Sequence, residues 1–296
     1  MARLVERLAV GLRQYVFAVT TDDDRSVVVR LATGDSAGDL AGGVYWHERL
    51  RDVGAPLAQL LHADLAPTEG IPYMLLERLP GQDLGLVYDH LTRQQRFVIA
   101  ADIVAIQRAV AQLPRAHGFG FACSYDDPNL RASWYEVALA HVERSRQRIS
   151  AAGVTSAHVV SRVRACVEDS ASYLRAVEPI AFLDDTTTKN VLIFNGALSG
   201  IVDTDNVCFG DSLFTLALTR VALLAHGQDP EYADHWRDLL ALDGEQRRAL
   251  DVYTAMFLLD FLGELGHRFN RDEPVAYDAK YKRRLERLLS EALDRV

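Results

Sequence analysis

The sequence predicts an α+β protein of two lobes, with a small β-rich N-terminal lobe (residues 1–79) and a larger helical C-terminal lobe (residues 80–296). Three observations favour this bilobal fold. β-branched and aromatic residues are concentrated in strand-like segments of the first lobe. Pro80-Gly81 interrupts the pattern directly after them. From residue 91 onward, apolar residues recur mainly at helical spacing.

In the N-terminal lobe we expect strands at residues 4–10, 14–21, 26–33 and 73–79. Asp22-Asp23-Asp24 separates the second strand from the third, which predicts a hairpin. One helix is expected over residues 38–53, because Trp46 and Leu50 lie four residues apart on one face. Gly54-Ala55-Pro56 then ends that helix.

The C-terminal lobe is expected to be helical except for one hairpin. Helices are predicted at residues 91–112, 131–150, 156–176, 212–226, 230–241, 245–266 and 277–294. Asp229-Pro230 has the pattern of a helix start, with proline at the first helical position. Residues 191–194 and 198–202 are short strands, and Asn195-Gly196 between them is a strong two-residue turn. This order of elements is that of the protein-kinase fold, which by itself implies no activity.

Composition excludes several classes of protein. A formal net charge of −9 argues against a general nucleic-acid-binding protein. The three cysteines are widely spaced, which argues against a disulfide framework and against structural zinc. No apolar run is long enough to cross a membrane, and charges interrupt the N-terminal residues where a signal peptide would need an apolar core. We therefore expect a cytoplasmic protein, either a monomer or a homodimer. Motifs of zinc peptidases, serine hydrolases and dinucleotide-binding proteins are absent.

One loop contains residue types suited to phosphoryl transfer. Asp185 lies five residues before Asn190, and a carboxylate at such a place can orient or deprotonate an attacking hydroxyl. The D-x-x-x-x-N spacing alone is weak, because a capped polar loop can share it. Here the loop leads directly into the predicted hairpin, which ends at Asp203. We expect Asp203 to return beside the loop, where it and Asn190 would offer the hard oxygen ligands that Mg²⁺ prefers.

This segment resembles the core of the aminoglycoside phosphotransferase family of kinase-like small-molecule phosphotransferases. The family pattern is H-G-D-x-x-x-x-N, two strands, I-D-W-x-D and then G-D-P. Asp185 matches the catalytic Asp, whereas Asn190 and Asp203 match the metal-binding residues. Gly210-Asp211-Ser212-Leu213 matches the G-D-P-L that opens the next helix. The resemblance implies a protein-kinase-like fold, ATP or GTP as donor with Mg²⁺, and transfer to a hydroxyl of a small molecule.

The N-terminal lobe supplies candidate nucleotide-binding residues. Arg30 ends a predicted strand where kinases carry a lysine, so we expect it to hold the α- and β-phosphates, with Glu48 as its ion-pair partner. The alternative is a surface arginine on a strand. Residues 73–81 resemble the family's hinge, which implies that adenine binds backbone groups near Glu77 and Leu79. An ordinary interlobe strand would have the same sequence pattern.

Several positions depart from the family pattern. Leu183 replaces the family histidine, which usually braces the loop, and Asp184 replaces the glycine. Spacing favours Asp185 over Asp184 as the catalytic acid. The first hairpin has only Gly11, so no glycine-rich phosphate loop is visible, and the backbone near residues 12–15 is the candidate cover. Lys189, within the catalytic loop, either neutralises the transferred phosphate or is solvated.

The sequence gives fewer indications of the acceptor-binding site than of the nucleotide-binding site. Asp205, Asp260 and Glu264 are candidates for binding a cationic substrate, and the last two share a helix face. The leading interpretation is an ATP- or GTP-dependent O-phosphotransferase acting on an aminoglycoside-type or other cationic antibiotic. One alternative is a kinase of an endogenous metabolite, such as an amino alcohol or a sugar. Another, motivated by the missing histidine and lysine, is a non-catalytic kinase-like nucleotide-binding protein.

Overall fold

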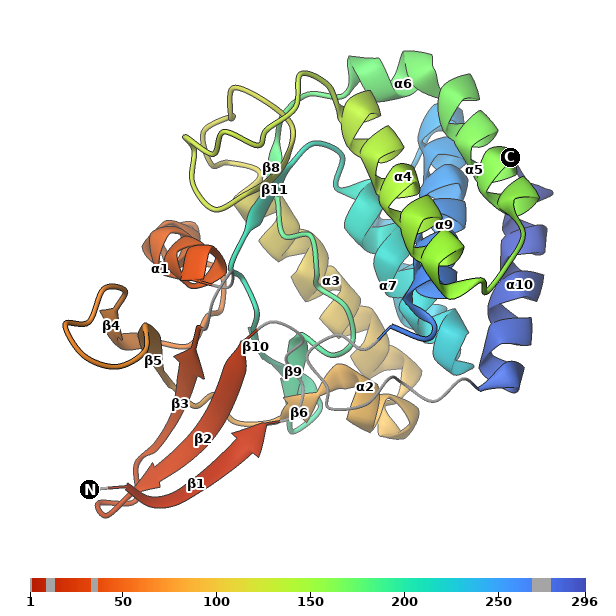
Figure 1. Ribbon diagram of the computed structural model, residues 1–296. Helices are drawn as coiled ribbons and strands as arrows, with labels where there is room; N and C mark the ends of the chain where they lie inside the picture. Colours follow the sequence, from red (N-terminus) through yellow and green to blue (C-terminus); the bar gives the residue numbers. More distant parts are fainter. Residues whose placement is uncertain (1, 9–13, 33–36, 268–277) are drawn as a thin grey trace.

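The computed structural model describes residues 2–8, 14–32, 37–267 and 278–296, and it has two lobes (Figure 1). The small lobe, red to orange in Figure 1, holds an antiparallel five-stranded sheet of order β1-β2-β3-β5-β4 with one helix beside it. Its elements are β1 (Ala2–Leu8), β2 (Tyr15–Thr21), β3 (Ser26–Leu31), α1 (Ala37–Asp52), β4 (Leu60–Asp64) and β5 (Tyr73–Glu77). The predicted lobe boundary after residue 79 falls between β5 and β6.

Most of the N-terminal predictions agree with these elements. The hairpin of β2 and β3 turns at residues 22–24, with Asp24 at φ 59°. Trp46 and Leu50 are both fully buried, so α1 packs through the predicted face. β4 was not predicted, because half-exposed Leu-Leu-His-Ala-Asp lacks a clear alternation. The predicted ends of the first and third strands, together with Gly11 and much of the candidate phosphate cover, lie outside the described residues.

The large lobe is helical, with short strands inserted (Figure 1). Its first half contains β6 (Gln82–Asp83), α2 (Leu84–Val87), the 3-10 helix η2 (Tyr88–His90), α3 (Arg93–Val110), β7 (Gly120–Ala122), α4 (Trp134–Ala152), α5 (Ala157–Asp169) and α6 (Ala171–Ala176). Its second half contains β8 (Ala181–Phe182), β9 (Val191–Phe194), β10 (Ala197–Ile201), β11 (Val207–Phe209), α7 (Leu213–His226), α8 (Glu231–Leu240), α9 (Gly244–Glu264) and α10 (Ala279–Leu293). The predicted helix 156–176 is divided at Ser170 into α5 and α6.

Two small sheets hold the ends of the loop that carries Asp185. β8 precedes this loop and belongs to the sheet β7-β11-β8, whereas β9 follows it and belongs to the sheet β10-β9-β6. The β9–β10 hairpin turns at Asn195-Gly196, and both residues have positive φ (51° and 78°), as the predicted turn requires. The loop is therefore anchored in two sheets at once.

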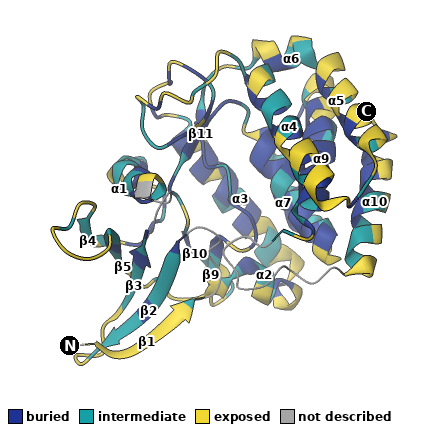
Figure 2. Ribbon diagram, in the orientation of Figure 1, coloured by how far each residue is buried: buried dark blue, intermediate teal, exposed yellow. Residues whose placement is uncertain are grey.

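The core of the large lobe forms around α9, which packs against α4, α7 and α10. Figure 2 shows α9 and α7 mostly in the colour of buried residues, while the outer faces of α4, α5 and α10 are exposed. The segment from Leu250 to Leu259 is buried almost without interruption, because neighbouring helices cover every side of it. No helix in the described part of the chain is both long enough and apolar enough to cross a bilayer.

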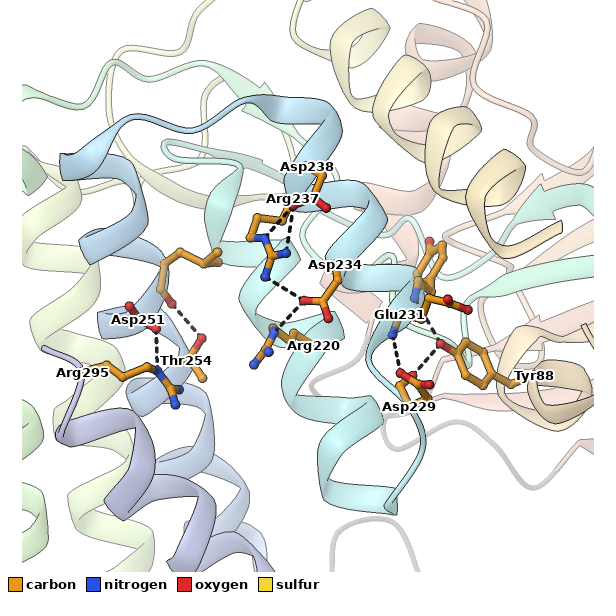
Figure 3. Close-up of polar contacts among 12 residues, drawn as sticks. Tyr88, Arg220, Asp229, Glu231, Asp234, Arg237, Asp238, Asp251, Thr254 and Arg295 are labelled. Carbon is orange, nitrogen blue, oxygen red and sulfur yellow. Dashed lines mark hydrogen bonds and ion pairs between the residues drawn. The ribbon is translucent and has the colours of Figure 1, made fainter. Parts of the chain in front are cut away.

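Polar contacts secure α8 against the start of the lobe (Figure 3). Tyr88 donates a hydrogen bond from Oη to the carbonyl of Asp229 (2.6 Å) and accepts one from the N–H of Tyr232 (3.2 Å). The carboxylate of Asp229 accepts a hydrogen bond from the N–H of Glu231, the first residue of α8 (3.0 Å). The predicted start at Asp229-Pro230 is therefore correct to within one residue.

Candidate active site

The loop 183–190 is fixed by side chains from the helices behind it. Gln107 of α3 accepts a hydrogen bond from the N–H of Leu183 (3.0 Å) and donates one to its carbonyl (2.9 Å). The same amide donates to Thr186 Oγ1 (3.3 Å), which lies 3.1 Å from Thr215 Oγ1 on α7. Gln107, Leu183 and Thr186 are all buried. A buried amide with several satisfied bonds holds a backbone segment in one conformation.

Asp185 has one carboxylate oxygen engaged within the loop. Its Oδ1 accepts a hydrogen bond from Thr187 Oγ1 at 2.6 Å, and Thr187 itself is 2% exposed. The backbone carbonyl of Asp185 accepts a hydrogen bond from Asn190 Nδ2 (3.0 Å). These contacts orient the carboxylate, and among the described residues Oδ2 has no hydrogen-bond donor. That oxygen is free to accept the proton of a hydroxyl group.

The hairpin brings Asp203 next to the loop. The N–H of Val202 donates to the carbonyl of Asn190 (3.0 Å), so Asp203 follows directly after a contact with the loop. Asp203 adopts a left-handed conformation (φ 63°), which is unfavourable for a residue other than glycine. Such strained residues are concentrated at functional sites.

Asn190 and Asp203 offer oxygens of the kind that Mg²⁺ binds. Asn190 donates a hydrogen bond from Nδ2 to the carbonyl of Asp185, so Asn190 Oδ1 points away from that bond. Among the described residues, no donor bonds to Asn190 Oδ1. Asp203 Oδ1 is bonded to an arginine, while Oδ2 has no partner among the described residues. No group of three or more His, Cys, Asp or Glu side chains in those residues could hold a metal ion. Two protein oxygens still fit Mg²⁺, which commonly takes its other ligands from water and substrate phosphates.

Arg30 lies at the end of β3, as predicted, but its partners are different. Its Nη2 donates to Asp205 Oδ2 (2.6 Å) and to Asp203 Oδ1 (3.0 Å). Glu48 is exposed on α1, so the predicted Arg30–Glu48 ion pair is wrong. The physical reason is that two carboxylates from the segment after β10 reach the buried guanidinium.

Asp184, the second acid of the loop, has an unusual pKa. Burial, with a smaller contribution from the neighbouring Asp185, raises the pKa of Asp184 to about 8. At neutral pH this carboxyl group therefore keeps its proton and cannot act as a base. Asp184 is therefore the less suitable of the two acids to accept a proton.

At the predicted hinge, one of the two residues has a free backbone donor. The N–H of Glu77 donates to the carbonyl of Gln59 (2.9 Å) and is therefore occupied. The N–H of Leu79 makes no hydrogen bond with the described residues. Adenine binding at Leu79 therefore remains a prediction, and Glu77 retains only its carbonyl for that role.

The predicted acceptor acids differ in availability. Both oxygens of Asp260 are engaged, by Ser145 Oγ (2.9 Å) and Arg148 (3.1 Å) on Oδ1 and by Arg144 (3.0 Å) on Oδ2. Asp205 is buried and bonded to Arg30. Internal arginines are the partners of both acids in this structure, so their predicted substrate role stays a prediction.

Glu264 is the remaining acid of the predicted set. It lies at the end of α9, 3.8 Å from Arg148, and its side chain is 39% exposed. Burial and the charge of Asp260 raise the pKa of Glu264 to about 7, while Arg148 and Lys189 oppose the rise. Lys189 is exposed on the loop and close enough for its charge to act on Glu264. Its predicted contact with the transferred phosphate stays a prediction.

A family model described as the phosphotransferase enzyme family matches residues 5–250. The chain belongs to this family. It is a phosphotransferase, as the resemblance implied. A search of curated proteins finds no match.

Solved structures share the fold of this phosphotransferase. A thermostable mutant of aminoglycoside phosphotransferase APH(4)-Ia is 16% identical, with a TM-score of 0.69 over 98% of this chain and 95% of the other. Aminoglycoside 2'-phosphotransferase-IIIa in complex with GDP is 14% identical, with a TM-score of 0.69 over 100% and 94%. A putative fructosamine-3-kinase from Thermobifida fusca YX-ER1 is 16% identical, with a TM-score of 0.61 over 100% and 94%. These likenesses confirm the kinase-like fold.

Three residues of this phosphotransferase site were missed by the sequence analysis. Gln107 carried no signal, since a single glutamine in a helix is ordinary. Thr187 belongs to the run Thr186-Thr187-Thr188, and three consecutive buried hydroxyls in a loop beside an acid are the one clue that was available. Gln14, which donates to Asp205 Oδ2 (2.8 Å), is 191 residues away in sequence.

Proposed function

We propose that this phosphotransferase moves the γ-phosphoryl group of ATP or GTP to a hydroxyl group of a small molecule. The observation that carries the proposal is the Asp185 carboxylate, held by Thr187 with one oxygen free, beside Asn190 and Asp203. Proteins of the same fold were solved with AMP-PNP, with ADP and with GDP, which supports nucleotide use without deciding between ATP and GTP.

In the proposed reaction, the acceptor hydroxyl approaches the free oxygen of Asp185. The hydroxyl oxygen of the acceptor bonds to the γ-phosphorus, while the bond from that phosphorus to the β–γ bridging oxygen breaks. The hydroxyl proton passes to Asp185, and the nucleoside diphosphate leaves with the bridging oxygen. Asn190 and Asp203 would hold Mg²⁺, which supplies positive charge next to the phosphate oxygens when bound. The part of Arg30 is to hold the phosphates that are not transferred.

The acceptor proposal is a hydroxyl compound with a cationic group, such as an aminoglycoside-type antibiotic. Three ternary complexes of APH(4)-Ia mutants contain hygromycin B, which makes that class the first to test. Of the predicted acids, Glu264 has the most distant internal arginine, Arg148 at 3.8 Å, which makes it the most available for a cation. The shorter internal contacts of Asp205 and Asp260 favour a second candidate with less positive charge, an endogenous sugar or amino alcohol.

The test has two steps. The first measures thermal stabilisation by ATP and GTP with and without Mg²⁺, and the second measures nucleoside diphosphate release across antibiotics, sugars and amino alcohols. Asp185→Asn should abolish transfer and keep nucleotide binding, while the matched change Asp184→Asn should retain transfer. If neither nucleotide stabilises the protein, the proposed function fails. The alternative of a non-catalytic nucleotide-binding protein then fails as well. Nucleotide binding without transfer to any acceptor would favour the non-catalytic alternative.

A further inference from the structure

Arg30 is bound by two carboxylates that differ in their surroundings. The Asp205 contact is the shorter of the two, and both of its side chains are 11% exposed. The Asp203 side chain is 56% exposed. An ion pair shielded from water is stronger than one that solvent screens, provided that its partners are well bonded. Asp205 is therefore the tighter partner of Arg30.

A further donor secures Asp205 itself. Gln14 Nε2 donates to the same oxygen, Asp205 Oδ2, that Arg30 binds (2.8 Å). Arg30 uses only Nη2 for its two ion pairs, and its Nε and Nη1 have no partner among the described residues. A guanidinium held at one nitrogen keeps donors on its other two nitrogens, and these can bind phosphate oxygens.

Helix α1 makes room for Asp205 rather than carrying the counter-ion. A Cβ atom on Gly43 would lie 2.7 Å from Asp205 Oδ1, and one on Gly42 would lie 2.3 Å from the Asp205 carbonyl oxygen. Glycine within a helix is less favourable than alanine, so two consecutive glycines need a reason. The close approach of the Asp205 segment supplies it.

We propose that Asp205 is the positioning residue for Arg30 and takes the part predicted for Glu48. The counter-ion of the phosphate-binding cation then comes from the segment that follows the metal-binding residue, instead of from α1. Asp205 can hold the guanidinium when Asp203 is engaged elsewhere, and Nη1 and Nε remain free for the non-transferred phosphates. This inference rests on the proposed nucleotide-dependent function.

The experiment measures the Kd of ATP and GTP by titration calorimetry, with and without Mg²⁺, alongside Tm without ligand. Asp205→Asn should weaken nucleotide binding at least tenfold, and Glu48→Gln should change it less than twofold. Gly43→Ala keeps every charge and should weaken binding by displacing the carboxylate. The control Gly38→Ala, in the same helix with no atom within 4 Å of the added Cβ, should bind as the wild type does.

A double-mutant cycle separates positioning from a general structural role. In an Arg30→Gln background, Asp205→Asn should cause no further loss of nucleotide affinity, because its effect passes through Arg30. A full additional tenfold loss in that background would overturn the inference. A tenfold loss of nucleotide affinity in Glu48→Gln, combined with normal binding by Asp205→Asn, would also overturn it.

If Asp205→Asn does not fold, the comparison of Gly43→Ala with Gly38→Ala decides the question. Wild-type protein that binds neither nucleotide overturns the proposed function as well, whereas normal binding by Asp205→Asn and Gly43→Ala overturns only the inference.

Discussion

The side-chain amide of Gln107 pairs with both backbone polar groups of Leu183, at 3.0 Å and 2.9 Å. Leu183 stands where the family has a histidine that usually braces the loop. The amide reaches the loop from α3, so a different element supplies the brace. The carboxylate of Asp185 lies two residues further on.

Gln107→Leu should destabilise the protein and slow phosphoryl transfer. The change leaves a buried N–H and a buried carbonyl without partners, which costs about 2–4 kcal/mol in the free energy of unfolding. Nucleotide Kd should change little, whereas kcat should fall at least tenfold. Gln112→Leu is the matched control, since Gln112 is exposed just beyond the same helix. A lower Tm with an unchanged kcat would show that the amide stabilises the fold but does not position Asp185.

Thr187→Val should lower kcat with little change in Tm or in nucleotide Kd. Valine keeps the shape of threonine but cannot donate to Asp185 Oδ1, so the carboxylate loses its fixed orientation. We expect a decrease of about tenfold, as is typical when a supporting hydrogen bond is lost. Thr187→Ser should restore most of the rate. Thr188→Val, also buried in this loop, changes a hydroxyl that has no partner among the described residues. Equal effects of the two valine variants would argue against an orienting role.

Substitutions of Asp260 and Glu264 should have different effects, one on stability and the other on acceptor binding. Asp260→Asn breaks a buried ionic network and should lower the free energy of unfolding by about 2 kcal/mol, discounted because its arginine partners are partly exposed. It should leave the KM of a cationic acceptor unchanged. Glu264→Gln should raise that KM with little change in Tm. The opposite pattern would restore the original assignment of Asp260 to the substrate.

The acceptor KM should also depend on pH if the acceptor is cationic. Burial raises the pKa of Glu264 to about 7, so this carboxyl group gains its negative charge as the pH rises through 7. The KM should therefore fall between pH 6 and pH 8 in initial-rate measurements. Glu264→Gln should remove this dependence. A KM independent of pH in the wild type would indicate that Glu264 does not bind the acceptor cation.

Acidification should destabilise the protein through His141. Burial, with help from Arg144 and Arg148, lowers the pKa of His141 to about 4, although Asp260 opposes the shift. The unfolded chain binds a proton at this site from about pH 6.5 downward, whereas the folded protein does not until about pH 4. Stability is therefore fully present above pH 6.5 and is lost between those values, by at most about 3 kcal/mol.

Denaturant titrations between pH 7 and pH 4 measure that loss. His141→Phe, in a site that already contacts the rings of Phe214 and Phe257, should flatten the curve. His158→Gln, on the exposed side of α5, should leave it unchanged. A curve for His141→Phe as steep as the wild type's would assign the acid sensitivity to other groups.

Local sequence patterns predicted the secondary-structure elements of the candidate site. The turn at Asn195-Gly196 and the spacing from Asp185 to Asn190 are set within a few residues, so their structures could be read from the chain directly. Prediction failed for β4, whose five residues form a strand because β5 pairs with them. It also failed at Ser170, where one continuous helical pattern is divided in two. Neither feature has a local signal.

The sequence by itself determined the family and the bilobal order of elements, and it predicted Asp185, Asn190 and Asp203 as the central residues of the candidate site. Only the tertiary structure decided which partners bind the residues of the candidate site and its supporting loop. Arg30 meets Asp205 across 175 residues of sequence, and Gln107 meets Leu183 across 76. Contacts at such separations depend on how the lobes and helices pack, and buried charges and amides take whichever partner packing brings within reach. For that reason Glu48 and Asp260, which the pattern assigned to nucleotide and substrate, have other surroundings in the folded protein.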